Sequence, residues 1–138
     1  MKTFSYRDVP MNAIDLSRFS AKWQFRFNFY QQHGSPKDPR FAPAWKALPV
    51  GERLTININF LALFFSWIYL LTLGMWRKAV VVIAIFIGLF ALAFVLPTIL
   101  VQGLIGGFCA LLAHCTNYGY YLEQVKGRAS WNPFDGFI

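Results

Sequence analysis

Three runs of hydrophobic residues dominate the chain after its first 53 residues, at positions 54–76, 79–97 and 98–122. A membrane-crossing helix needs about 20 mostly apolar residues, within a range of roughly 17 to 25. The second and third runs meet this requirement. The first contains two early asparagines, which shorten its uninterrupted apolar part to residues 60–73. The pattern predicts two membrane-spanning helices and a first segment that either spans or re-enters the membrane.

A further helix is predicted at residues 16–33. Its apolar side chains recur every three or four positions, at Leu16, Phe19, Trp23, Phe27 and Tyr30. Asp15 or Ser17 fits the position that caps its start, and Gly34 fits the position after its end. Four prolines in the following loop then break any long helix, which leaves one helical turn near residues 44–48.

The opposite face of this first helix is basic, with Arg18, Lys22 and Arg26. A basic amphipathic helix can lie on an anionic membrane surface with its aromatic side chains inward. It can equally pack against the protein's own membrane helices. The pattern alone leaves both arrangements open.

The charged residues are concentrated outside the hydrophobic runs. The chain is 57% hydrophobic and only 14% charged, against roughly a quarter charged in soluble domains. Its net charge is +7, and residues 1–53 carry nine of the thirteen Lys and Arg residues. We therefore expect an all-α integral membrane protein with a basic head (residues 1–53), a helical membrane body (54–122) and a short polar and aromatic tail (123–138).

The first 19 residues lack the apolar core of a secretory signal and carry five charged side chains. The first hydrophobic segment is therefore expected to direct insertion. Cytoplasmic loops are rich in Lys and Arg. All thirteen cations lie in the cytoplasm if the first segment dips in and returns, while the uncharged turn at residues 96–100 faces outward. A fully spanning first segment is the alternative.

Arg77 and Lys78 are the only charged residues between positions 54 and 122. Two adjacent cations without a nearby carboxylate would have no partner if buried. We therefore expect Trp76, Arg77 and Lys78 to anchor a tight turn at the anionic cytoplasmic leaflet, together with Lys126 and Arg128 after the third run.

The third run carries a stripe of small residues, Gly103, Gly107 and Ala110. Such spacing allows a second helix to approach closely, and Gly88 in the second run is the expected contact. The stripe continues as His114, Asn117 and Tyr121, which form a candidate intramembrane polar site with Asn57 and Asn59.

His114 is the only His, Lys, Arg, Asp or Glu within the third run, and such a group inside a membrane is a functional candidate. The alternative is a neutral histidine that shares hydrogen bonds with Asn117, Thr116 or an asparagine of the first segment.

Several kinds of chemistry lack their residues. No carboxylate lies between positions 54 and 122, which disfavours hydrolase chemistry inside the membrane. Cys109 and Cys115 lie six residues apart on one helix, too far to pair, and they do not form a metal site with His114. No phosphate-binding loop is present. We expect no cofactor, no metal and no enzymatic activity. Nucleic-acid binding is disfavoured, because anionic lipid explains the basic aromatic run "KWQFRFNFY".

The runs "NFLALFFSWIYLLTLGMWRKA" and "NYGYYLEQVKGR" resemble the small bacterial membrane proteins grouped as domain of unknown function 2628. Shared elements are an asparagine before an aromatic-rich segment, a Gly-Met-Trp-Arg-Lys turn and a closing Asn-Tyr-x-Tyr-Tyr followed by basic residues. The head is similar to YigF-like enterobacterial members, and the resemblance covers residues 23–128. Many members have Phe-Gly-Pro where this chain has Ser66 and Trp67, so no kink is expected there. The resemblance implies a multi-pass protein of the bacterial inner membrane and no established activity.

These features favour a non-enzymatic inner-membrane protein that binds a membrane-protein partner or a second copy of itself, or that protects the membrane. One alternative is a small transporter or channel component that uses His114, Asn117 and Tyr121. Another is an immunity protein against a pore-forming toxin.

Overall fold

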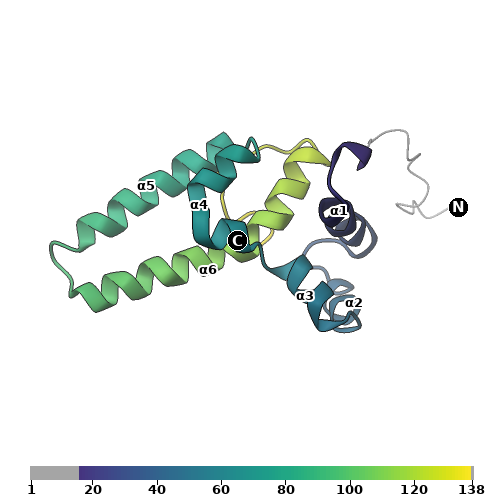
Figure 1. Cartoon of the computed structure of the whole chain (residues 1–138), viewed down its shortest axis with the longest axis horizontal. Coiled ribbons are helices and arrows are strands. Elements are labelled where there is room, and N and C mark those ends of the chain that lie inside the picture. Colours follow the sequence, from purple (N-terminus) through teal and green to yellow (C-terminus); the bar gives the residue numbers. More distant parts are fainter. Residues whose placement is uncertain (1–15, 138) are drawn as a thin grey trace, which may run out of the picture. The chain divides into compact units, whose positions relative to one another are not determined.

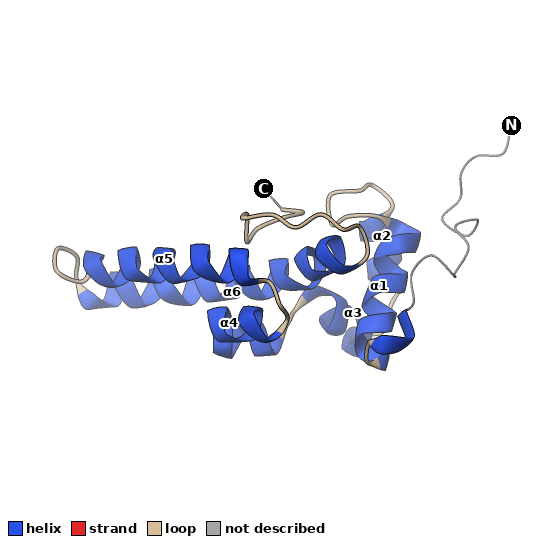
Figure 2. Cartoon of the chain, turned by 90° about the horizontal axis from the view of Figure 1, so that it is seen from above, coloured by secondary structure: helices blue, strands red, loops and turns tan. Residues whose placement is uncertain are grey.

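The computed structural model describes residues 16–137, and this part of the chain contains helices and loops but no strand (Figures 1 and 2). The elements in chain order are a short 3-10 helix Leu16–Arg18, α1 Ala21–His33, α2 Phe41–Lys46, α3 Val50–Asn57, α4 Phe60–Thr72, α5 Trp76–Leu92 and α6 Thr98–Gln124. The expected all-helical fold is confirmed for this part. The prediction that the first 19 residues are not a secretory signal concerns residues that lie almost wholly outside the described part of the chain.

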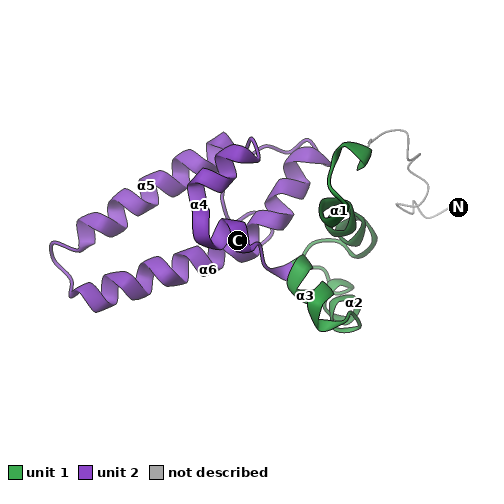
Figure 3. Cartoon of the chain, viewed as in Figure 1, with its two compact units in different colours: residues 1–56 green, residues 57–138 purple. Residues whose placement is uncertain are grey.

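The chain divides into two compact units, residues 1–56 and residues 57–138 (Figure 3). The first corresponds closely to the expected head. The second contains the first hydrophobic segment from residue 57 onward, the two later segments and the tail.

In the first unit, helix α1 has well-defined ends. The Ser20 hydroxyl accepts a hydrogen bond from the Trp23 backbone N–H at 3.4 Å, so Ser20 caps the helix instead of Ser17. The alternative cap, Asp15, lies outside the described residues. Gly34 ends the helix as predicted: it has φ 80°, and its N–H donates to the Tyr30 carbonyl at 2.8 Å. The predicted turn in the following loop is present as α2, which begins three residues earlier than expected.

Helix α1 also binds the end of α3. The Arg26 guanidinium donates to the Thr55 carbonyl at 2.7 Å, and the Tyr30 hydroxyl donates to the Ile56 carbonyl at 3.0 Å. Carbonyls in the last turn of a helix lack partners within it and carry partial negative charge. Arg26 is only 3% exposed and lies 4.5 Å from the Trp23 ring centroid. Its expected place on an exposed basic face is therefore wrong.

In the second unit, α5 and α6 form a long antiparallel hairpin, in which they lie side by side in both views (Figures 1 and 2). The register is set by Lys78, whose side chain lies against Gly119, and by the edge-to-face rings of Phe86 and Phe108, 5.2 Å apart. Helix α4 packs against both α5 and α6, beside the half of the hairpin at which α5 begins.

The two halves of the hairpin differ in burial. We call residues 76–82 and 112–124 the base, and residues 83–111 the distal hairpin. Most of the buried side chains of α5 and α6 lie in the base. In the distal hairpin Val101 is the one buried residue. Its large apolar side chains that stay exposed are Ile87, Phe90, Leu92, Phe94, Val95, Ile99, Leu100, Leu104 and Leu111.

Helix α4 is broken at Ser66, which has φ 39° and ψ −114°. The expectation that this chain has no kink there is wrong.

By length and composition, residues 50–72 and 98–124 are apolar enough to cross a membrane, and only 28% and 22% of their most apolar windows are buried. The first stretch is not one continuous helix, however, because it is interrupted between α3 and α4 and again at Ser66. At 17 residues, α5 is about 25 Å long.

Replacing Ser66 with glycine should stabilise the protein. A side chain in this region of φ costs about 1–2 kcal/mol, part of which is offset by the greater freedom of glycine in the unfolded chain. We expect Ser66→Gly to raise the free energy of unfolding in detergent by about 1 kcal/mol. Ser66→Ala keeps a Cβ and should change it by less than about 0.5 kcal/mol. Equal effects of Ser66→Gly and Ser66→Ala would show that the backbone at Ser66 is not strained.

The contact between Arg26 and α3 predicts an unequal response of two basic residues on α1. Charged hydrogen bonds contribute about 1.5–3 kcal/mol, so Arg26→Ala should lower the free energy of unfolding by about 2 kcal/mol. Lys22 is exposed, and Lys22→Ala should change it by less than about 0.5 kcal/mol. Thermal melts of the full chain measure both, and equal losses would refute the contact.

Candidate functional site

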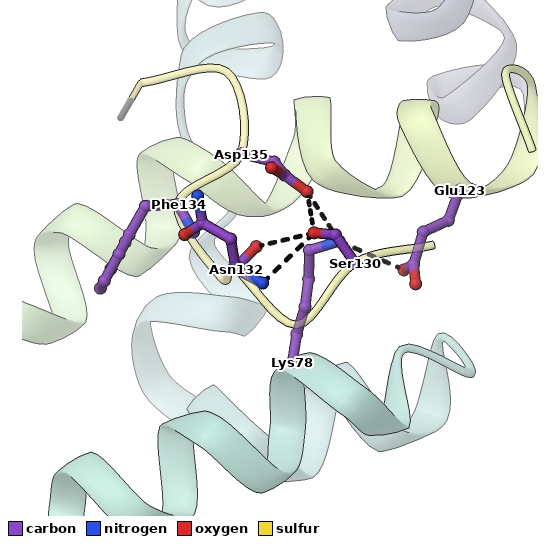
Figure 4. A network of polar contacts seen from close by, with 6 residues as sticks. All are labelled: Lys78, Glu123, Ser130, Asn132, Phe134 and Asp135. Atoms are coloured by element: carbon purple, nitrogen blue, oxygen red, sulfur yellow. Dashed lines mark hydrogen bonds and ion pairs between the residues drawn. The ribbon is translucent and has the colours of Figure 1, made fainter. Parts of the chain in front are cut away.

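A cluster of charged side chains, with Lys78 buried at its centre, joins the base of the hairpin to the tail (Figure 4). The Lys78 ammonium is 3.4 Å from an Asp135 carboxylate oxygen and 3.7 Å from a Glu123 carboxylate oxygen. The Lys78 side chain is 2% exposed, and those of Glu123 and Asp135 are 10% and 21% exposed. The premise that Lys78 has no carboxylate partner is therefore wrong, and Lys78 is not an exposed anchor in this structure.

The cluster depends on ionic attraction more than on hydrogen bonding. Among the described residues, neither the Lys78 ammonium nor the Glu123 Oε2 atom, both buried, has a hydrogen-bond partner. Buried charges are costly unless they are paired, so each member of the cluster needs the others. Asp135 is oriented by the Ser130 hydroxyl, which donates to its carboxylate, while Asn132 closes the same turn of the tail.

Aromatic contacts hold the tail against the hairpin. The rings of Trp131 and Trp76 meet edge to face at 5.3 Å, and those of Phe134 and Phe108 at 5.9 Å. The Arg77 guanidinium lies 5.5 Å from the Trp76 ring and 5.9 Å from the Trp131 ring. Both tryptophans are about half exposed. Arg77 thus lies near the surface while its neighbour Lys78 is buried.

A second polar group joins α4 to α6. The Asn59 side-chain amide donates to the Asn117 side-chain oxygen at 3.0 Å, and the Asn59 backbone N–H donates to the Ala113 carbonyl at 2.9 Å. The Asn59 side-chain oxygen also accepts from the Ala62 backbone N–H at 3.1 Å, which caps α4. Two members of the predicted polar site, Asn59 and Asn117, are thus brought together. Asn57 ends α3, two residues earlier.

His114 does not join this pair. His114 Nδ1 is 2.8 Å from the Ala110 carbonyl of its own helix, and the side chain is half-buried. The expectation that His114 bonds with Asn117, Thr116 or an asparagine of the first segment is therefore wrong. Tyr121 is buried in the base, with its ring 5.6 Å from that of Tyr118.

The small-residue stripe faces outward. Gly88, Gly103, Gly107 and Ala110 are all exposed. A methyl group added at any of these three glycines would meet nothing within 4 Å. The expected contact between Gly88 and the stripe of α6 is therefore not made within this chain.

The described residues include no group of three or more His, Cys, Asp or Glu side chains placed to hold a metal ion. Cys109 and Cys115 are free. Lys126 is half-buried and Arg128 exposed, both just after α6.

Sequence reasoning missed the two carboxylate partners of Lys78. Glu123 and Asp135 lie 45 and 57 positions after it in the chain. One signal in the sequence could have found Glu123: it is the first charged residue after Lys78.

Comparison with known sequences relates this chain to uncharacterised proteins. The chain belongs to the family described as "Protein of unknown function (DUF2628)", whose model matches residues 15–126. It is 44% identical to "Uncharacterized protein YigF" of Salmonella typhimurium over 133 residues, covering 90% of this chain and 99% of that protein. It is 45% identical to the Escherichia coli K12 protein of the same name over 117 residues, covering 82% and 90%. No solved structure matches the chain.

The charge cluster predicts a large effect of removing its cation. Lys78→Met leaves the carboxylates of Glu123 and Asp135 without their partner, and breaking a buried pair costs about 3–5 kcal/mol. We expect a loss of this size in the free energy of unfolding, measured by denaturation in detergent. Arg128→Ala removes an exposed cation nearby and should have little effect.

A double variant tests whether the loss is electrostatic. Glu123→Gln removes one uncompensated charge with little change in shape, so Lys78→Met combined with Glu123→Gln should be more stable than Lys78→Met alone. Further destabilisation in the double variant would show that Lys78 acts through packing instead of charge.

Proposed function

We propose that this protein is a non-enzymatic, multi-pass integral protein of the bacterial inner membrane that acts by binding another membrane protein or a second copy of itself. The observation that carries this proposal is the distal hairpin. Its apolar side chains are exposed on α5, on the turn and on α6, and no charged residue lies between positions 79 and 122. Exposed apolar surface of this extent is typical of contact with lipid or protein.

The base supports an orientation for this hairpin. Arg77 lies beside two half-exposed tryptophans, and Lys126 and Arg128 follow α6. Tryptophan and basic residues are enriched where helices leave the cytoplasmic face of a membrane. The proposal therefore places the base, the tail and the basic head on the cytoplasmic side.

The transporter alternative receives less support than the binding function. Its three residues do not form one group, because His114 bonds to its own helix and is separate from the Asn59–Asn117 pair. The immunity alternative rests on no particular residue of this chain. The exposed stripe of Gly103, Gly107 and Ala110 is compatible with close approach of another helix, which agrees with a binding function.

Alkaline carbonate washing of membranes from cells that express the full chain tests the insertion. We expect the protein to stay in the membrane pellet. Aspartate near the centre of a membrane helix costs roughly 3 kcal/mol, so Ile87→Asp combined with Leu104→Asp should release a large share of it. Gln32→Asp adds a charge at an exposed site of α1 and should not.

Release of the unmodified chain by carbonate would refute membrane insertion. The binding function is tested separately, by purification in mild detergent. A stoichiometric partner or a homo-oligomer is expected, and a lone monodisperse monomer would contradict it.

A further inference from the structure

We propose that α4 is a re-entrant segment, which enters the bilayer from the side of the base, turns at Ser66 and leaves on that same side. Its exposed apolar side chains would then contact the acyl chains of one leaflet only. The inference rests on the proposed insertion of the hairpin, and it specifies which part of the bilayer the protein occupies.

The two ends of α4 lie at nearly the same level along α6. At its start, Asn59 bonds to Ala113 and Asn117. At its end the chain turns directly into α5, where Lys78 lies against Gly119. Six residues of α6 separate Ala113 from Gly119, which is about 9 Å at 1.5 Å per residue. A segment that crossed the hydrocarbon core would have ends about 30 Å apart along the hairpin.

The hydrogen bonding of Asn59 shows that α4 folds back on itself. The Asn59 side-chain amide lies 3.4 Å from the Tyr69 hydroxyl. In a straight helix these two residues would be separated by about 15 Å along the axis, farther than a tyrosine side chain reaches. The break at Ser66 between them brings Tyr69 back toward the start of the helix.

The bend carries the most exposed apolar side chains of α4. Phe64 and Phe65, next to Ser66, are 75% and 53% exposed. The other exposed apolar side chains of this helix are Phe60, Leu61, Ile68 and Leu71. No residue of α4 is charged. Backbone that is not helical is tolerated at membrane depth where it is covered by protein, and α4 packs against both α5 and α6.

Acyl chains are the occupant that fits this surface. The large exposed side chains at the bend are apolar, whereas Trp76 and Arg77 follow the exit of α4 within a few residues. This change from phenylalanine to tryptophan and arginine is the order of side chains from the hydrocarbon region to the headgroups. If a second copy of the chain covered α4 instead, nothing would explain this order of side chains.

Cysteine labelling of the full-length protein in membranes tests the inference. Cys109→Ala and Cys115→Ala provide a background without native cysteines. Single cysteines are then placed before α4 (Glu52→Cys), at its end (Thr72→Cys) and in the tail (Ala129→Cys), all at exposed positions. A membrane-impermeant maleimide should label all three in inverted vesicles and none in intact spheroplasts.

The outcomes separate this inference from the proposed function. If the chain resists carbonate but Glu52→Cys and Ala129→Cys are labelled from opposite sides, α4 crosses the membrane and the re-entrant arrangement is overturned, while insertion stands. If carbonate releases the chain, both proposals fail. Strong protection of Phe64→Cys from the maleimide in both preparations should accompany same-side labelling. Free labelling of Phe64→Cys would show that the bend lies in water and would overturn the inference.

Discussion

The hydrogen bonds of Asn59 determine how α4 is placed in the second unit. Hydrophobic packing has little directional preference, and α4, α5 and α6 are all apolar, so packing alone would allow α4 to slide along the hairpin. Asn59 is 2% exposed and bonds to both Ala113 and Asn117 of α6. A buried amide is costly without partners. Any shift of α4 would lose these bonds, so the position of α4 on α6 is fixed.

The charge cluster has a similar role at the other side of the base. It joins α5, the end of α6 and the tail through Lys78, Glu123 and Asp135. Because the tail is tied down there, Trp131 comes to lie beside Trp76 and Arg77. The base is thus a polar and aromatic assembly, whereas the distal hairpin is almost purely apolar. This difference along one hairpin is the main support for the proposed membrane location.

The sequence predicted the elements far better than their contacts. The hydrophobic runs gave α5 and α6, and the apolar spacing with Gly34 gave α1 and its end, because these signals are local. The break at Ser66 was missed because serine carries none of the usual signals of glycine or proline. The ion pairs of Lys78 were missed because their partners are distant in sequence. Spacing also placed Gly88 and Gly103 on helix faces, but it could not tell whether those faces meet another helix.

Arg26 shows the same limit in the head. Its position on a helical wheel is close to that of Lys22, about 40° away, and the wheel does not show the end of α3, to which Arg26 bonds. His114 is the converse case. A lone histidine in an apolar run suggests function, yet the carbonyl four residues earlier provides a partner within its own helix.

Because Lys78 precedes Asp135 in the chain, the lysine has one role before the tail is synthesised and another role afterwards. A ribosome completes Lys78 57 residues before Asp135 and 45 before Glu123. While α5 is being inserted in the proposed arrangement, Lys78 and Arg77 therefore form an unneutralised pair of positive charges, which is the feature that retains the start of a helix in the cytoplasm. Once the tail has been made, Asp135 and Glu123 neutralise the lysine. A charge that first sets orientation thus ends as part of the folded interior.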